Sequence, residues 1–126
     1  MTTFIEPNNL GDLLKYEADK NYCREVITVA QGQNLKLGTI LGMSNKTDQV
    51  KAVSLDDKVT DETNIAIGVL MEDVDATDGA KKSLMVTRDV IVSSAYTIFP
   101  NSATAEQKKK ITKDLEARGL VIRQSA

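Results

Sequence analysis

The sequence contains no histidine and no tryptophan, and its single cysteine is Cys23. Histidine is the commonest general base and a frequent metal ligand, so its absence removes the usual apparatus of hydrolysis and of metal-dependent catalysis. One cysteine cannot form an internal disulfide, and without a histidine it cannot form a Cys/His catalytic pair. We therefore expect Cys23 to be a buried structural thiol.

Long apolar runs and a targeting signal are also missing. No stretch approaches the roughly 20 apolar residues that cross a bilayer, and the start, "MTTFIEPNNL", lacks the basic and apolar segments of a signal peptide. The length of 126 residues, with 41% hydrophobic and 27% charged residues, is typical of one soluble domain. These features predict a protein made in the cytoplasm, with no membrane partner.

Aromatic residues make up only 4% of the chain, so the core has to be built from aliphatic side chains. So light a core favours oligomerisation. Most of the aromatics lie in the first 22 residues, where intrinsic structure is weak, and large aromatic side chains are favoured interface anchors. This indicates an arm that orders against a partner, while a segment packed on its own domain is the alternative that the residues leave open. The candidate anchors are Phe4, Leu10, Leu13, Leu14, Tyr16 and Tyr22.

The net charge is only -2, but the two signs are unevenly distributed. Residues 48–79 hold nine acids and two bases, whereas residues 80–126 hold nine bases and four acids. Most of these bases fall on one predicted helix with no aromatic residue among them. This pattern favours a solvated helix face over direct nucleic-acid binding.

Short apolar runs of period two predict a mainly β fold. Two such runs, "REVITVA" at 24–30 and "LKLGTILG" at 35–42, are joined by a "QGQN" turn, and we expect them to pair with each other. Gly38 and Gly42 indicate a bend or bulge in the second run. Strands this short and frequent predict a compact barrel or clip. Further strands are expected at 49–55, 64–74 and 83–99.

One helix is predicted near the C-terminal end, at about 105–118. The segment "TAEQ" fits a capping box that begins at Thr104, and Gly119 stands where a C-terminal glycine belongs. Ile111 and Leu115 lie one turn apart, on a face that can dock on a sheet. The "LVIR" segment after the glycine predicts a last strand.

The densest group of acids lies in "GVLMEDVDATDGA", residues 68–80. A calcium loop of the EF-hand type needs oxygen ligands at positions 1, 3 and 5, glycine at position 6 and an acid at position 12. Counted from Asp73, position 6 is Asp78 and position 12 is Leu84, so the register fails. A solvated turn is the simpler interpretation. A ligand-binding or metal-binding β module that uses residues 72–78 is the alternative.

No catalytic apparatus is visible in the chain. Glycine-rich motifs that cradle phosphates are absent, and nothing in the sequence places an activating base beside Ser93 or Ser94. We therefore predict no catalytic residue, no cofactor and no metal, and we do not expect an enzyme.

Several short segments follow one another at a characteristic spacing: "KYE" at 15–17, "REV" at 24–26, "LGTILG" at 37–42, "EDVDAT" at 72–77, and the closing helix with "GLVIR". In this order, from about Leu13 to Arg123, they resemble the bacteriophage head decoration protein family of the lambda type. The resemblance implies a β-clip-like subunit of mainly β class with α+β character. It also implies two parts, namely a flexible capsid-binding arm at 1–22 and a single β-rich decoration domain at 23–126.

The resemblance further implies a partner and a place. Such subunits form homotrimers and bind the major capsid protein on the outside of the expanded head, at three-fold and quasi-three-fold positions, where they stabilise the shell against internal DNA pressure. The arm is expected to order by strand addition, which favours the arm over the self-packed alternative. We expect synthesis in the host cytoplasm and residence on the outer surface of the virion. Another virion assembly or connector protein is the competing hypothesis.

Overall fold

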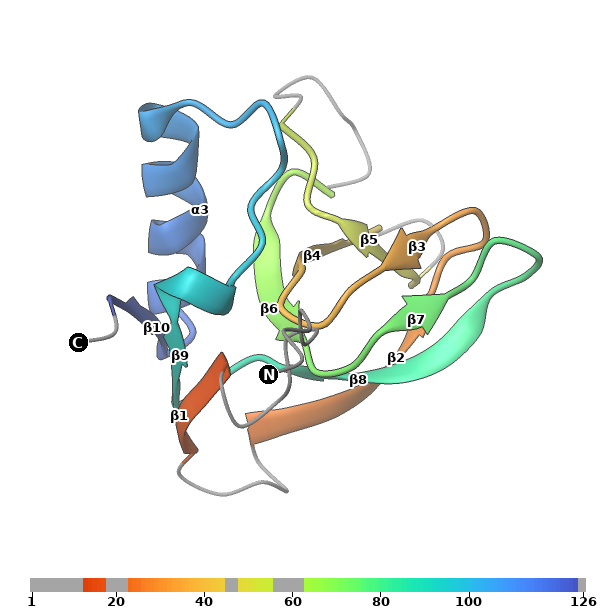
Figure 1. The fold of residues 1–126 in the computed structure, drawn as a ribbon, viewed down its shortest axis with the longest axis horizontal. Helices are drawn as coiled ribbons and strands as arrows, with labels where there is room; N and C mark the ends of the chain where they lie inside the picture. The colour runs from red at the N-terminus through yellow and green to blue at the C-terminus, as the bar shows by residue number, and fades with distance from the viewer. Residues whose placement is uncertain (1–12, 18–22, 45–47, 56–62, 125–126) are drawn as a thin grey trace, which may run out of the picture.

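A computed structural model describes residues 13–17, 23–44, 48–55 and 63–124, and its centre is a closed five-stranded barrel (Figure 1). A separate two-stranded sheet of β3 (Asn34–Leu35) and β7 (Val74–Asp75) lies beside the barrel. The barrel strands, in their order around it, are β2 (Arg24–Val29), β5 (Val50–Ala52), β4 (Ile40–Met43), β6 (Ala66–Leu70) and β8 (Lys81–Val86).

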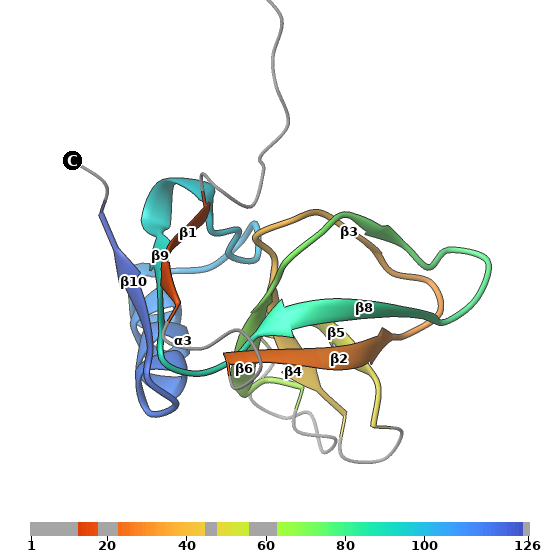
Figure 2. The same ribbon diagram turned by 90° about the horizontal axis from the view of Figure 1, so that it is seen from below.

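A three-stranded sheet and a helix form the other end of the molecule (Figure 2). The sheet has the order β1 (Leu14–Glu17), β9 (Val90–Ser93) and β10 (Leu120–Arg123). β1 runs antiparallel to β9, and β10 runs parallel to it. The 3-10 turn η1 (Ser94–Tyr96) follows β9, and α3 (Ala105–Glu116) leads into β10.

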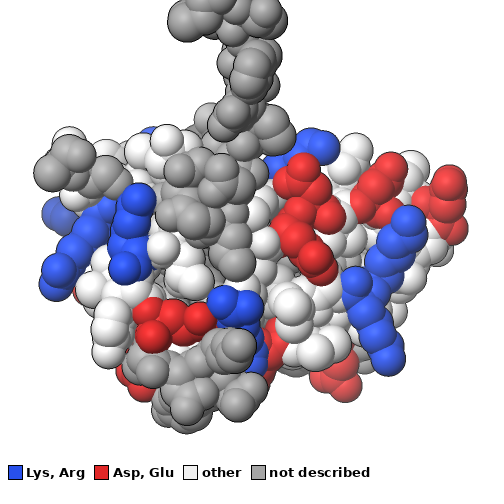
Figure 3. Space-filling model, turned by 60° about the horizontal axis from the view of Figure 1, so that its bottom comes forward, with Lys and Arg blue, Asp and Glu red and all other residues white. Residues whose placement is uncertain are grey.

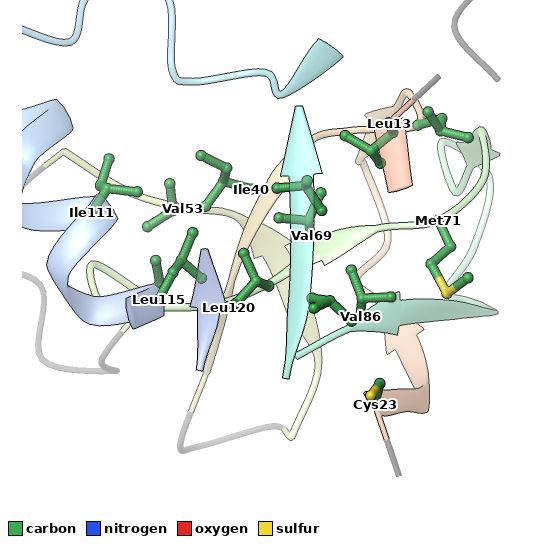
Figure 4. Close-up of a cluster of buried hydrophobic side chains, with 14 residues drawn as sticks. Leu13, Cys23, Ile40, Val53, Val69, Met71, Val86, Ile111, Leu115 and Leu120 are labelled. Carbon is green, nitrogen blue, oxygen red and sulfur yellow. The ribbon is translucent and has the colours of Figure 1, made fainter. Parts of the chain in front are cut away.

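Two apolar clusters hold these parts together. One fills the barrel around Leu41, Val50 and Leu70. The other lies between the barrel, α3 and the three-stranded sheet, and it joins side chains from distant parts of the chain (Figure 4). Its members include Leu13, Cys23, Ile40, Val69, Val86, Ile111, Leu115 and Leu120.

The mainly β fold with one C-terminal helix is confirmed, and the caps of that helix form as predicted. The hydroxyl of Thr104 accepts a hydrogen bond from the N–H of Gln107, and the Gln107 side chain accepts one from the N–H of Thr104. The helix ends at Glu116, two residues earlier than expected. Its last turn tightens because Arg118 and Gly119 donate their N–H groups to carbonyls three residues back.

The predicted pairing of 24–30 with 35–42 is wrong. β2 instead pairs over its whole length with β8, from Arg24 opposite Val86 to Val29 opposite Lys81. The run 35–42 is divided into β3 and β4 by a turn at Gly38, whose φ is +95°. A positive φ is accessible to glycine and interrupts the regular pleat, so the two halves pair with different strands. The irregularity expected at Gly42 does occur, between Leu41 and Gly42 against β6.

Gly32 and Gly38 have similar φ angles but different surroundings. Replacing each by alanine therefore separates the cost of backbone strain from the cost of a steric clash. Gly32 has φ +92° and open space around an added Cβ, whereas a Cβ on Gly38 would lie 2.1 Å from the carbonyl oxygen of Tyr96. Gly32→Ala should lower the free energy of unfolding by about 1 to 2 kcal/mol, through backbone strain alone. Gly38→Ala should cost clearly more, because backbone has to move.

Urea unfolding, monitored by circular dichroism, measures the free energy of unfolding of both variants. Gly79→Ala is the control, since Gly79 has neither a positive φ nor a neighbour within 4 Å of the added atom. Equal stability of the Gly38→Ala and Gly32→Ala proteins would contradict the close approach to Tyr96.

Candidate functional site

Strand β1 is the described part of the segment predicted to be an arm. Leu13, immediately before it, is fully buried, and Leu14 is half-buried against the same cluster. Tyr16 is 57% exposed. The other three predicted anchors, Phe4, Leu10 and Tyr22, lie outside the described residues. The structure therefore shows Leu13 packed in the body of the protein and Tyr16 accessible to a partner.

An ion pair fixes the end of β1 to the start of the barrel. The Arg24 guanidinium donates from Nε to one oxygen of the Glu17 carboxylate at 2.6 Å, and from a terminal nitrogen to the other at 2.9 Å. The hydrogen bond to Glu17 raises the pKa of Arg24. Two parallel bonds of this kind restrain orientation as well as distance. The pair thus links the three-stranded sheet to β2.

The outer face of the three-stranded sheet carries an apolar row. Tyr16 lies opposite Ile91 on β9, and Ile91 lies opposite Val121 on β10. A hollow of about 280 Å³ is lined by these three residues together with Asp89, Val90 and Gly119, and we call it the sheet hollow. The alternate residues Val90, Val92 and Leu120 face the core. An aromatic side chain therefore borders an open apolar depression.

A second hollow, of about 250 Å³, lies among β3, β4, β5 and the segment after η1. We call it the Ile98 hollow, because Ile98 is 37% exposed at its wall. Lys108 reaches over the ring of Phe99 there, with its Nζ 5.7 Å from the ring centroid. Its lining includes Leu35, Lys36, Ile40, Ala52, Ile98 and Phe99.

The acidic stretch 72–78 contains the short strand β7 and the turn that follows it, and three of its carboxylates have partners within the chain. Glu72 accepts a hydrogen bond from the hydroxyl of Ser83, and Asp73 accepts one from the N–H of Leu37. Hydrogen bonds from Thr77 lower the pKa of Asp75. On the face shown in Figure 3, acidic side chains lie beside a column of basic ones. Among the described residues, no three His, Cys, Asp or Glu side chains gather as a metal site requires.

The remaining sequence predictions concern single features. Cys23 is buried, and its thiol lies 3.6 Å from the carbonyl oxygen of Asp89. The lysines of α3 are exposed, as expected of a solvated helix face. No helix in the described ranges combines the length and apolar character needed to cross a membrane.

The described surface therefore offers two apolar depressions and a strand, β1, that the Glu17–Arg24 pair ties to the barrel. A model of the family described as bacteriophage lambda head decoration protein D matches residues 3–120. The chain therefore belongs to the head decoration protein family. Proteins of this family are structural components of the phage head, which places the chain on the capsid of the virion. A search of curated proteins finds no match.

Sequence reasoning missed three parts of this surface. Ile91 and Val121 read as ordinary strand residues, and only the pairing register aligns them with Tyr16. The Glu17–Arg24 pair joins residues close in sequence, but nothing in the pattern indicates that these two charged side chains pair and are partly buried. The Ile98 hollow depends on long-range packing and has no local signal.

Leu13 and Tyr16 should contribute differently to the stability of the fold. Leu13→Ala should lower the free energy of unfolding by about 2 to 5 kcal/mol, because it leaves a cavity in the core. Tyr16→Ala should cost less than about 1 kcal/mol, because its main neighbour in the chain is one cross-strand residue. Urea unfolding of the two variants measures the difference. An equally small effect of Leu13→Ala would contradict the burial of Leu13 in the apolar cluster.

Proposed function

We propose that the protein binds as homotrimers to the outside of the expanded phage head, at three-fold and quasi-three-fold positions, and stabilises the shell against the pressure of packaged DNA. Its partner there is the major capsid protein. Family membership across residues 3–120 is the observation that carries the proposal. A trimer that bridges neighbouring capsid subunits adds interface energy that must be broken before the shell opens. No enzymatic step and no contact with DNA is required.

The capsid-binding arm of this proposal is the predicted segment 1–22, and β1 acts as its root. Residues 1–12, with Phe4 and Leu10, reach the shell by adding a strand to a capsid-protein segment. Burial of Leu13, pairing of β1 with β9 and the Glu17–Arg24 bond support a root that stays with the body. Force on the arm is then passed to the core of the decoration protein.

Avidity explains why three arms are needed. Ordering a flexible segment costs roughly 1 to 2 kcal/mol per residue, so a single arm binds weakly. After one arm of a trimer docks, the other two bind at high effective concentration, and avidity gains roughly 100-fold to 10,000-fold. Trimer formation and capsid binding are therefore coupled.

Two truncations separate the arm from its root. A protein lacking residues 1–12 keeps Leu13 and β1, so it should fold with nearly normal stability and lose binding to expanded shells. A protein lacking residues 1–22 should also lose stability, because it loses a core side chain and an edge strand. Cosedimentation with purified expanded shells measures binding, and urea unfolding measures stability. If the protein lacking residues 1–12 bound expanded shells as well as the complete chain does, the arm would have no part in the mechanism.

Dependence on maturation is the second expected property. Strand addition requires an edge that the shell exposes, and expansion is the step that we propose exposes it. Unexpanded shells should therefore bind far less protein than expanded shells in the same cosedimentation assay. Equal occupancy of the two shells would contradict this part of the proposal.

A further inference from the structure

The sheet of β1, β9 and β10 has apolar residues on both faces. Val90 and Leu120 point to the core, while their neighbours Ile91 and Val121 lie on the outer face with Tyr16. Parallel strands such as β9 and β10 that are apolar on both faces are typical of sheets covered on both sides. The described residues leave Tyr16 on this face 57% exposed and the sheet hollow uncovered. This predicts a cover in the assembled protein.

The charged residues around the two hollows indicate which surface covers the outer face of the three-stranded sheet. Among the described residues that line the sheet hollow, the charged one is Asp89, and among those of the Ile98 hollow it is Lys36. Lys108, over the ring of Phe99, adds a second positive charge beside the Ile98 hollow. The two depressions are therefore both apolar and carry opposite charges at their walls, so the two surfaces match in charge, and Tyr16 is the exposed side chain that can fill a hollow.

The two hollows also lie on different parts of the chain. The three-stranded sheet is at the left of Figure 1, and the strands β3, β4 and β5 of the Ile98 hollow are at its centre and right. A contact between two different patches of identical chains is heterologous, and a heterologous contact closes into a ring when its rotation permits. An isologous pairing would instead give a two-fold dimer.

We infer that a second copy of this chain covers the sheet hollow. Tyr16 of one copy enters the Ile98 hollow of the next, and Asp89 faces Lys36 across the contact. The inference rests on the proposed homotrimer and names the surface that forms it. Tyrosine suits the role because it buries a large rigid area at little cost in side-chain entropy. Residues 1–12, which precede β1, stay available for the shell.

Sedimentation equilibrium of the full chain tests the contact from both sides. Tyr16→Ala removes the inserted side chain, and Ile98→Glu places a charge in the receiving hollow. Each should raise the concentration at which half of the trimer dissociates by at least about tenfold, the scale of an interface hot spot. Val26→Ala is the matched control: Val26 is 70% exposed but lines neither hollow, so its trimer should be unchanged.

The opposed charges provide an independent test. Lys36→Glu should weaken the trimer, because it brings an acid against Asp89. Asp89→Asn removes that repulsion and keeps a side chain that tolerates the positive φ of +53° at this position. The loss caused by Lys36→Glu should therefore be smaller in the Asp89→Asn background. Losses of equal size in both backgrounds would overturn the facing of these two residues.

The outcomes distinguish this inference from the proposed function. Unchanged trimers in the Tyr16→Ala and Ile98→Glu proteins, each folded by circular dichroism, would overturn the contact and leave the trimer standing. If these two variants formed normal trimers but no longer cosedimented with expanded shells, the sheet hollow would be a contact with the capsid protein. That result would also overturn the inference. A wild-type chain that stays monomeric at all concentrations would instead remove the homotrimer from the proposed function.

Discussion

Burial of one side chain, Leu13, is the constraint on which the arrangement at this end of the molecule depends. It sits in the cluster that α3, the barrel and the three-stranded sheet share, at the point where the chain enters its first described strand. That position holds β1 against β9 and leaves Tyr16 on the outer face. A polar residue there would have to be desolvated, which would favour release of the strand.

A strand fixed to the body of the protein suits the proposed role, because that role is to resist mechanical load on the shell. An arm attached to a loose loop would extend under load before it resisted. In the proposed mechanism, an arm that continues from a strand with a buried leucine and a two-bond ion pair would pass load into the apolar cluster. The proposed contact through Tyr16 would pass part of that load to the next copy, so that three bodies share it.

Local features of this fold were predictable from sequence, and long-range ones were not. The capping box at Thr104, the glycine after the helix and most strand positions depend on a few neighbouring residues, and all were expected. Strand partners depend on the whole chain, so the pairing of β2 with β8 was missed. For the same reason the burial of Leu13 was not predicted, since its cluster includes side chains as distant in sequence as Leu120. Tyr16 was a candidate because aromatic residues concentrate in the first 22 positions, and the structure leaves it 57% exposed.

The parallel pairing of β10 with β9 has a consequence for synthesis on the ribosome. The strand that completes the sheet is synthesised about a hundred residues after β1, and Leu120 from it joins Leu13 in one cluster. Contacts between such distant positions form only after most of the chain is available. A nascent chain that has not yet reached β10 therefore lacks one wall of the cluster in which Leu13 is buried.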